Sequence, residues 1–127
     1  MKSIIYLILL LFVYNSSVAQ TTDESGKVTV AIFYKTSDVR RQHGRVEIPV
    51  PPDFIVVGGG ATASKEGKGA LLTASFPNEQ LSSWVVASKD HQEPHPHHLQ
   101  GYAIGMKVQG MTREQLRSFI SVSRVVS

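Results

Sequence analysis

Short apolar runs that are rich in β-branched residues recur along the chain, and turn-forming residues separate them. In residues 27–34 ("KVTVAIFY") the side chains alternate with a period of two, which is typical of a strand. Similar runs predict strands over residues 45–50, 54–57, 69–75, 83–88, 101–108 and 120–126. Pro49 has no N–H group, so the strand over residues 45–50 should end there or lie at a sheet edge. The sequence therefore predicts a mainly β fold, a compact antiparallel sandwich- or barrel-like single domain.

One segment near the C-terminus has a different pattern. Thr112 and Gln115 have the spacing of a capping box, which predicts one short helix over residues 112–119. Residues 21–26 ("TTDESG") are polar and predict a frayed tail, and residues 35–44 lack an apolar period and predict a loop.

The N-terminus has the three parts of a secretory signal peptide. A short basic start is followed by the apolar run Ile4–Val13 and by the small-x-small sequence Ser17-Val18-Ala19. The apolar run is too short to span a bilayer comfortably, although an N-terminal membrane anchor is the alternative. Residues 1–19 are thus predicted to be a signal peptide and residues 20–127 a single exported β-rich domain. We expect a secreted or periplasmic protein with no stable membrane insertion after cleavage.

The chain contains no cysteine, so a disulfide framework and thiolate metal ligands are excluded. Small exported domains without disulfides suit a bacterium better than an animal. The formal net charge is +3, and acidic residues are interspersed among the basic ones. A nucleic-acid surface needs a stronger field and stacking aromatic side chains, so we expect no nucleic-acid partner.

The glycine triplet at residues 58–60 raises the question of a phosphate-binding loop. Such a loop needs a third, correctly spaced glycine and a following helix, but Ala63 stands at that position and no helical pattern follows. The glycines instead predict positive φ angles, a β-bulge or a close backbone contact.

The segment Lys89–Leu99 ("KDHQEPHPHHL") contains four of the five histidines. Imidazole suits zinc, so His91, His95, His97 and His98 are the candidate metal ligands. Neither an extended nor a polyproline II segment makes three of them converge, so a ligand such as Asp90 or His43 would have to join them. The alternative interpretation is a solvated loop, and we then expect no cofactor.

Two further constellations have the residue types of a site. Ser75, Ser88, Asp90 and the histidines contain the groups of a Ser–His–Asp hydrolase, but the Gly-x-Ser-x-Gly elbow is absent. Trp84 and Tyr102, with Phe76, have the side chains of an aromatic platform, for which burial in the core is the alternative.

Four segments together resemble small secreted bacterial β-rich modules. They are "VVGGGA" (56–61), "LLTASFP" (71–77), "WVVASKDH" (84–91) and "YAIGMKV" (102–108). The resemblance covers residues 54–108 and implies export and a single β domain. It implies no activity and no functional site.

The sequence favours an exported non-enzymatic binding module for an unknown extracellular or cell-surface ligand, a glycan or a protein. The predicted ligand-binding residues are Trp84, Asp90, His91 and Tyr102, with the loops at residues 61–67 and 90–100 as the recognition surface. The alternatives are a metal-binding protein or metal-dependent enzyme that uses residues 91–98, and a secreted hydrolase.

Overall fold

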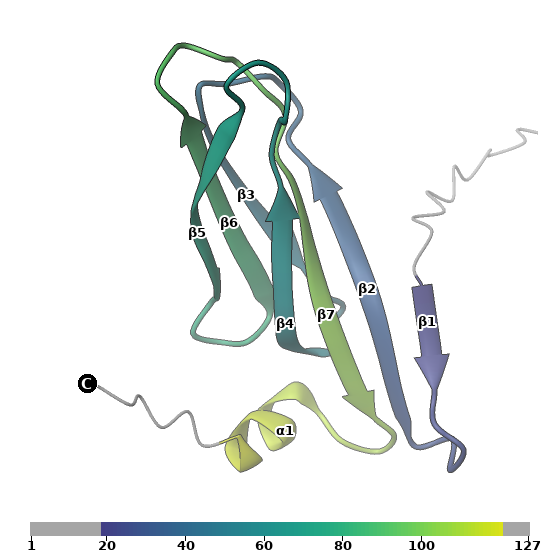
Figure 1. The fold of residues 1–127 in the computed structure, drawn as a ribbon. Helices are drawn as coiled ribbons and strands as arrows, with labels where there is room; N and C mark the ends of the chain where they lie inside the picture. Colours follow the sequence, from purple (N-terminus) through teal and green to yellow (C-terminus); the bar gives the residue numbers. More distant parts are fainter. Residues whose placement is uncertain (1–18, 121–127) are drawn as a thin grey trace, which may run out of the picture.

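The computed structural model describes residues 19–120, which form two antiparallel sheets packed face to face and one short helix (Figure 1). The elements are β1 Ala19–Thr22, β2 Val28–Thr36, β3 His43–Pro49, β4 Ile55–Thr62, β5 Ala70–Pro77, β6 Ser83–Asp90, β7 Gln100–Val108 and α1 Arg113–Phe119. One sheet has the order β1-β2-β7-β4 and the other the order β3-β6-β5. The predicted mainly β fold is confirmed, and the two separate sheets make it a sandwich rather than a closed barrel.

The predicted strands within the described residues are present, with bounds that differ by a few residues. β4 is longer than predicted because the glycine triplet continues the strand. Pro49 is the last residue of β3, which is an edge strand, as its missing N–H group requires. The predicted strand over residues 120–126 lies outside the described residues apart from Ile120, as does the predicted signal peptide apart from Ala19.

The prediction of a frayed tail over residues 21–26 is wrong. Residues 19–22 form β1, which pairs with β2 in the register Thr22 opposite Thr29. All four β1 residues are exposed, so the strand has no apolar pattern that could reveal it. Backbone pairing and the contact between the Thr22 and Thr29 hydroxyls, 3.1 Å apart, hold it in place.

The β1–β2 hairpin is closed by one carboxylate. Asp23 accepts hydrogen bonds from Ser25 Oγ at 2.6 Å and from the backbone N–H groups of Lys27 and Val28 at 3.1 and 3.0 Å. The Ser25 hydroxyl first, and then the Val28 N–H group, hold the pKa of Asp23 below its ordinary value of 3.8. The charged carboxylate therefore favours the folded hairpin.

We expect this hairpin to open in acid. A carboxyl group with a lowered pKa stabilises the fold above the ordinary value of 3.8, and that stabilisation is lost as the pH falls through the folded value. Asp23→Asn should lower the hydrogen-exchange protection of the β1–β2 ladder at neutral pH and remove most of its acid dependence, measured by NMR. The neighbouring exposed Glu24→Gln is the control and should retain both. Equal acid dependence in wild type and Asp23→Asn would contradict the prediction.

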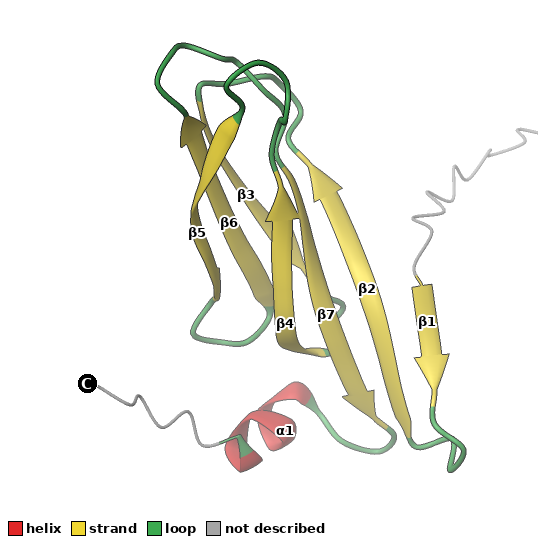
Figure 2. Cartoon of the chain, viewed as in Figure 1, coloured by secondary structure: helices red, strands yellow, loops and turns green. Residues whose placement is uncertain are grey.

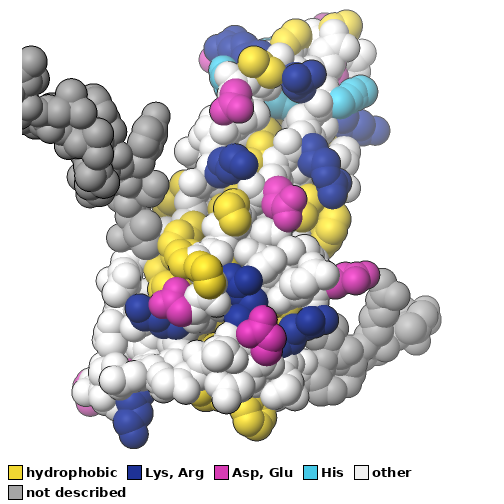
Figure 3. Space-filling model, turned by 180° about the vertical axis from the view of Figure 1, so that it is seen from behind, with side chains coloured by type: hydrophobic (Ala, Val, Ile, Leu, Met, Phe, Trp, Pro, Cys, Tyr) yellow, Lys and Arg dark blue, Asp and Glu magenta, His cyan; other side chains and the backbone are white. Residues whose placement is uncertain are grey.

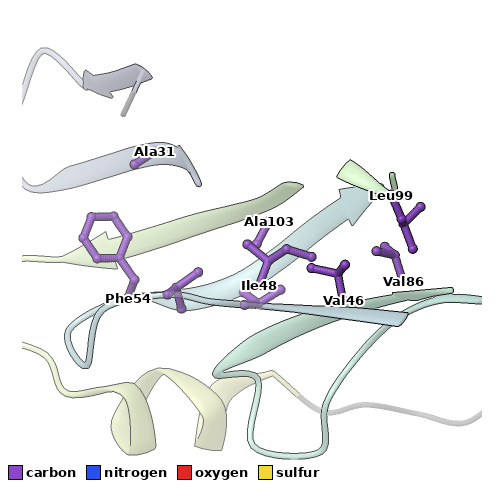
Figure 4. Close-up of a cluster of buried hydrophobic side chains, with 9 residues drawn as sticks. Ala31, Val46, Ile48, Phe54, Val86, Leu99 and Ala103 are labelled. Atoms are coloured by element: carbon purple, nitrogen blue, oxygen red, sulfur yellow. The ribbon is translucent and has the colours of Figure 1, made fainter. Parts of the chain in front are cut away.

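The core forms where large side chains of one sheet meet very small residues of the other. β3 and β6 contribute Val46, Ile48 and Val86, whereas the facing β7 contributes Ala103 (Figure 4). A Cβ atom on Gly101 would lie 2.4 Å from Ile48 Cδ1 and 2.8 Å from Val86 Cγ2. The small residues Gly101 and Ala103 on β7 therefore let the two sheets approach closely.

The glycine triplet serves the same close approach. A β-bulge lies between Val56 and Gly58, and a Cβ atom on Gly59 would lie 2.4 Å from Trp84 Cγ. The predicted bulge and close contact are therefore confirmed, whereas none of the three glycines has a positive φ angle. The triplet lies within β4 and is not followed by a helix, so the arrangement of a dinucleotide-binding loop is absent from it.

Helix α1 closes the lower end of the sandwich. Both hydrogen bonds of the predicted capping box are present, from Gln115 N–H to Thr112 Oγ1 at 3.2 Å and from Thr112 N–H to Gln115 Oε1 at 2.8 Å. Leu116 is buried against Ile55 and Leu81 in a second, smaller apolar cluster. Between residues 19 and 120, no helix is long and apolar enough to cross a membrane.

Candidate functional site

Three loops meet at the upper end of the sandwich, opposite α1 (Figures 1 and 2). They follow β2, β4 and β6 and consist of residues 37–42, 63–69 and 91–99, which we call the loop end. All five histidines of the chain lie in the loop end or, for His43, directly beside it. Figure 3 shows histidine side chains at this end, among basic and acidic side chains. The fold thus gathers polar groups that are far apart in the sequence.

Hydrogen bonds connect two loops of the loop end, residues 37–42 and 91–99. Arg41 and His97 form an isolated antiparallel bridge in which each N–H group donates to the other's carbonyl at 3.0 Å. Ser37 adds three bonds: its N–H group donates to the Leu99 carbonyl, its Oγ accepts from Leu99 N–H at 3.0 Å, and its carbonyl accepts from His98 Nδ1 at 2.9 Å. The loop before β7 is therefore anchored on the loop before β3.

One imidazole is buried at the base of these loops. His97 is only 3% exposed, and its Nδ1–H group donates to the carbonyl of His95 at 2.7 Å. Because a carbonyl can only accept, this bond fixes the tautomer, and His97 Nε2 then accepts from Ser88 Oγ at 2.7 Å. The interpretation of residues 91–98 as a solvated loop is therefore wrong for His97. It is right for His98, which is exposed.

Ser88, His97 and Asp90 together have the composition of a catalytic triad. His97 Nδ1 lies 3.7 Å from Asp90 Oδ1, which is buried and has no hydrogen-bond partner among the described residues. Ser88 is also only 3% exposed, and its Oγ faces Gly44 and Leu99 inside the sandwich. A serine nucleophile must reach a substrate carbonyl, and the Nδ1–H group of its histidine normally points at the carboxylate. The array therefore favours a structural role over the hydrolase hypothesis.

A pocket of about 230 Å³ opens between the second and third loops. Its polar lining consists of Arg40, Thr62, Ser64, Glu66, His95, His97, His98 and Gln100, and Ala63 and Pro96 add apolar surface. Ser64 Oγ and His95 Nε2 share a hydrogen bond at 2.9 Å, which links the two walls of the pocket. The pocket thus offers both donors and acceptors on walls that are joined to each other.

The four histidines proposed as metal ligands are only partly brought together. The rings of His95 and His97 are stacked, with centroids 6.2 Å apart and planes 10° apart. Both ring nitrogens of His97 already have partners, and His98 Nδ1 donates to Ser37. Among residues 19–120, no group of three or more His, Cys, Asp or Glu side chains is arranged to hold a metal ion.

The four residues predicted to bind a ligand lie at three different places. His91 lies in the loop end and Asp90 directly before it, but Trp84 lies six positions before Asp90 along β6, about 20 Å at the rise of a strand. Trp84 packs against the core, and its Nε1–H group donates to Ser75 Oγ at 2.9 Å. Tyr102 lies over Gly60 on the other sheet, beside Tyr34. Trp84 is thus partly buried, at the border of the core.

Sequence reasoning included Ser64 in the predicted recognition loop at residues 61–67 but missed Arg40 as a pocket residue. Both lie in loops that contribute no histidine to the pocket, so no local motif marks them. The available signal is their position between predicted strands, and it becomes useful only when the sheet order places the three loops at one end.

In comparisons with protein-family models, curated proteins and solved structures, none matches this chain.

Proposed function

We propose that the protein is an exported, non-enzymatic binding module whose loop end takes a glycan outside the cell or at its surface. The N-terminal pattern of residues 1–19 supports export. The observation that carries the binding proposal is the pocket between two loops that are hydrogen-bonded to each other through Ser64 and His95. Loops held on a rigid sheet are common recognition surfaces.

The chemistry of the pocket suits a ligand rich in hydroxyl groups. Each sugar hydroxyl both donates and accepts, so it needs a wall that does both. Arg40 supplies only donors, Glu66 supplies acceptors, and the Gln100 amide supplies both. The apolar surface of Ala63 and Pro96 gives the CH face of a sugar ring a contact. A small, partly polar pocket of this kind favours one or two sugar units of a longer chain.

The proposal predicts that Arg40 contributes to glycan binding and that Arg41 does not. Arg40 lines the pocket, whereas the side chain of its neighbour Arg41 does not. Arg40→Gln should weaken glycan binding about tenfold, because a hydrogen bond from a charged donor is lost. Arg41→Gln removes the same charge one residue away and should bind like wild type. The measurement is a glycan array with the purified full-length expression product, followed by calorimetry on the best glycan.

Two results would count against the proposal. Wild-type protein that retains no glycan on the array would remove the glycan as the ligand class. Equal weakening by Arg40→Gln and Arg41→Gln would show a general charge effect, and the pocket would not be the site.

A further inference from the structure

Within residues 19–120, the strands of the larger sheet place no charged residue on its outer face. On β2, β7 and β4, which lie side by side (Figure 1), the outward residues alternate with the buried ones and align in rows across the sheet. Nearest the loop end, the rows are Thr36, Gln100 and Thr62; Tyr34, Tyr102 and Gly60; and Ile32, Ile104 and Gly58. Lys35 and Lys107 lie at inward-facing positions of β2 and β7. The outer face of the smaller sheet, in contrast, carries Arg45, Glu47 and Lys89.

Two tyrosines, which we call the tyrosine pair, occupy the middle row of this face. Tyr34 and Tyr102 are directly opposed on β2 and β7, and their ring centroids lie 6.2 Å apart with the planes at 47°. Tyr34 is 55% exposed and Tyr102 is half-buried. A Cβ atom on Gly60 would lie 2.6–2.9 Å from three atoms of the Tyr102 side chain, so only a glycine there lets this side chain extend across β4. The glycine triplet thus gives the tyrosine pair its room on the outer face, as it gives Trp84 room on the inner one.

The tyrosine pair adjoins the pocket of the loop end. Thr62 and Gln100 line that pocket and belong to the next row of the same face, two positions away along β4 and β7. Rows two positions apart are separated by about 6.6 Å, which is comparable with the length of one sugar unit. The Gln100 amide also donates to Thr36 Oγ1 at 3.2 Å and so continues the polar row across to β2. A chain that leaves the pocket along β7 therefore reaches the tyrosine pair with its next unit.

The size of this surface favours a short stretch of chain over a protein partner. Three rows on three strands cover roughly 20 Å by 14 Å at the spacings of a β-sheet. Farther along β7, Met106 already packs against the smaller apolar cluster that contains Leu116. Each partner of a stable protein complex buries about 800 Å², which is far more than these rows offer.

We propose that the tyrosine pair stacks a sugar unit next to the one held in the pocket, an inference that rests on the glycan function proposed above. A tyrosine ring offers apolar surface to the CH face of a sugar, and its hydroxyl group both donates and accepts hydrogen bonds. Because the face carries no charge, the glycan is neutral. Because the rows run straight along β7, the glycan is an unbranched, extended chain. A β-1,4-linked glucan has this shape, whereas an α-1,4-linked chain curves away from a flat sheet.

The stacking is tested by titrating cellobiose and cellotetraose into the full-length expression product in a calorimeter. Wild type should bind the tetramer about tenfold more tightly than the dimer, because only the tetramer reaches the tyrosine pair. Tyr34→Ala should remove this gain and leave the affinity for cellobiose unchanged, whereas Tyr34→Phe retains the ring and should retain the gain. Val30→Ala truncates another exposed side chain on the same face, two rows farther along β2, and should behave like wild type. Maltotetraose should show no gain over maltose.

A second variant disturbs the tyrosine pair without removing a ring. Gly60→Ala places a methyl group where the Tyr102 side chain now lies, so the ring must leave its place over β4. This variant should also lose the gain from the longer chain. In wild type, the ring-proton NMR signals of Tyr34 and Tyr102 should shift on addition of cellotetraose and stay in place on addition of cellobiose. This measurement reports the contact directly and does not depend on the stability of any variant.

The outcomes separate this inference from the proposed function. Equal affinity of wild type for cellobiose and cellotetraose, or a gain that survives Tyr34→Ala, would overturn the tyrosine pair as a site. The pocket would still stand if Arg40→Gln weakened the binding of both sugars. An equal gain with maltotetraose would overturn the β-1,4 selectivity. A protein that ignores both cello-oligosaccharides and retains another glycan on the array would overturn this inference alone, whereas a protein that retains no glycan would overturn both.

Discussion

Replacement of Gly59 by alanine is expected to lower the free energy of unfolding by about 3 kcal/mol, because the sheets cannot separate without opening the core. The new Cβ atom would lie 2.4–2.6 Å from three ring atoms of Trp84. The indole cannot simply turn aside, because it packs against the core and its Nε1–H group is bonded to Ser75 Oγ. Chemical denaturation followed by circular dichroism measures the change.

The neighbouring glycine supplies a matched control. A Cβ atom on Gly58 would lie 3.5 Å from Ile104 Cδ1, an ordinary van der Waals contact. Gly58→Ala should therefore stay within about 0.5 kcal/mol of wild type. If the clash with the indole is the cause, Trp84→Leu should cost less in the Gly59→Ala background than in wild type, and a double-mutant cycle measures this coupling. Equal costs for the two glycine variants would contradict the packing account.

Replacement of His97 by alanine should lower the free energy of unfolding by about 2–4 kcal/mol, because a buried side chain and its hydrogen bonds are lost together. The variant leaves the Ser88 hydroxyl and the His95 carbonyl without these bonds. It also removes the imidazole that lies 3.7 Å from the buried Asp90 Oδ1. Denaturation followed by the fluorescence of Trp84, the only tryptophan, reports the loss.

His98→Ala is the control for this second prediction. It removes the same side chain from the next residue, which is exposed and makes one side-chain bond, to the Ser37 carbonyl. The expected change is within about 0.5 kcal/mol. Ser88→Ala should lie between the two, at about 1–2 kcal/mol, because only the partner of His97 Nε2 is removed. A His97→Ala variant as stable as His98→Ala would show that the buried cluster does not anchor the loop.

Most of the fold could be predicted because its strands bury one face and expose the other. The period of two in β3, where buried and exposed residues alternate, is visible in the sequence. β1 could not be found because every side chain in it is exposed and only its backbone pairs. The capping box at Thr112 was predictable because it is a local arrangement of four residues.

The loop end was predictable in position and not in its contacts. The histidine segment lies between two strands, so a loop was expected there. The burial of His97 depends on Ser88, on β6, and on the Arg41 backbone, which comes from a loop more than fifty residues earlier in the chain. No local pattern encodes such contacts, because they arise only when the sheet order β3-β6 brings these segments together.

The pairing of β2 with β7 determines when, during synthesis of the chain, the larger sheet can form. β2 spans residues 28–36 and β7 spans residues 100–108, so the central ladder of the larger sheet joins the two ends of the described chain. Contacts between residues so distant in sequence are slow to form, because the intervening chain must first lose its freedom. A nascent chain in which β7 has not yet been synthesised cannot assemble this sheet. Under the proposed export, such delayed assembly would keep the chain unfolded enough to pass through a translocation channel until β7 has been synthesised.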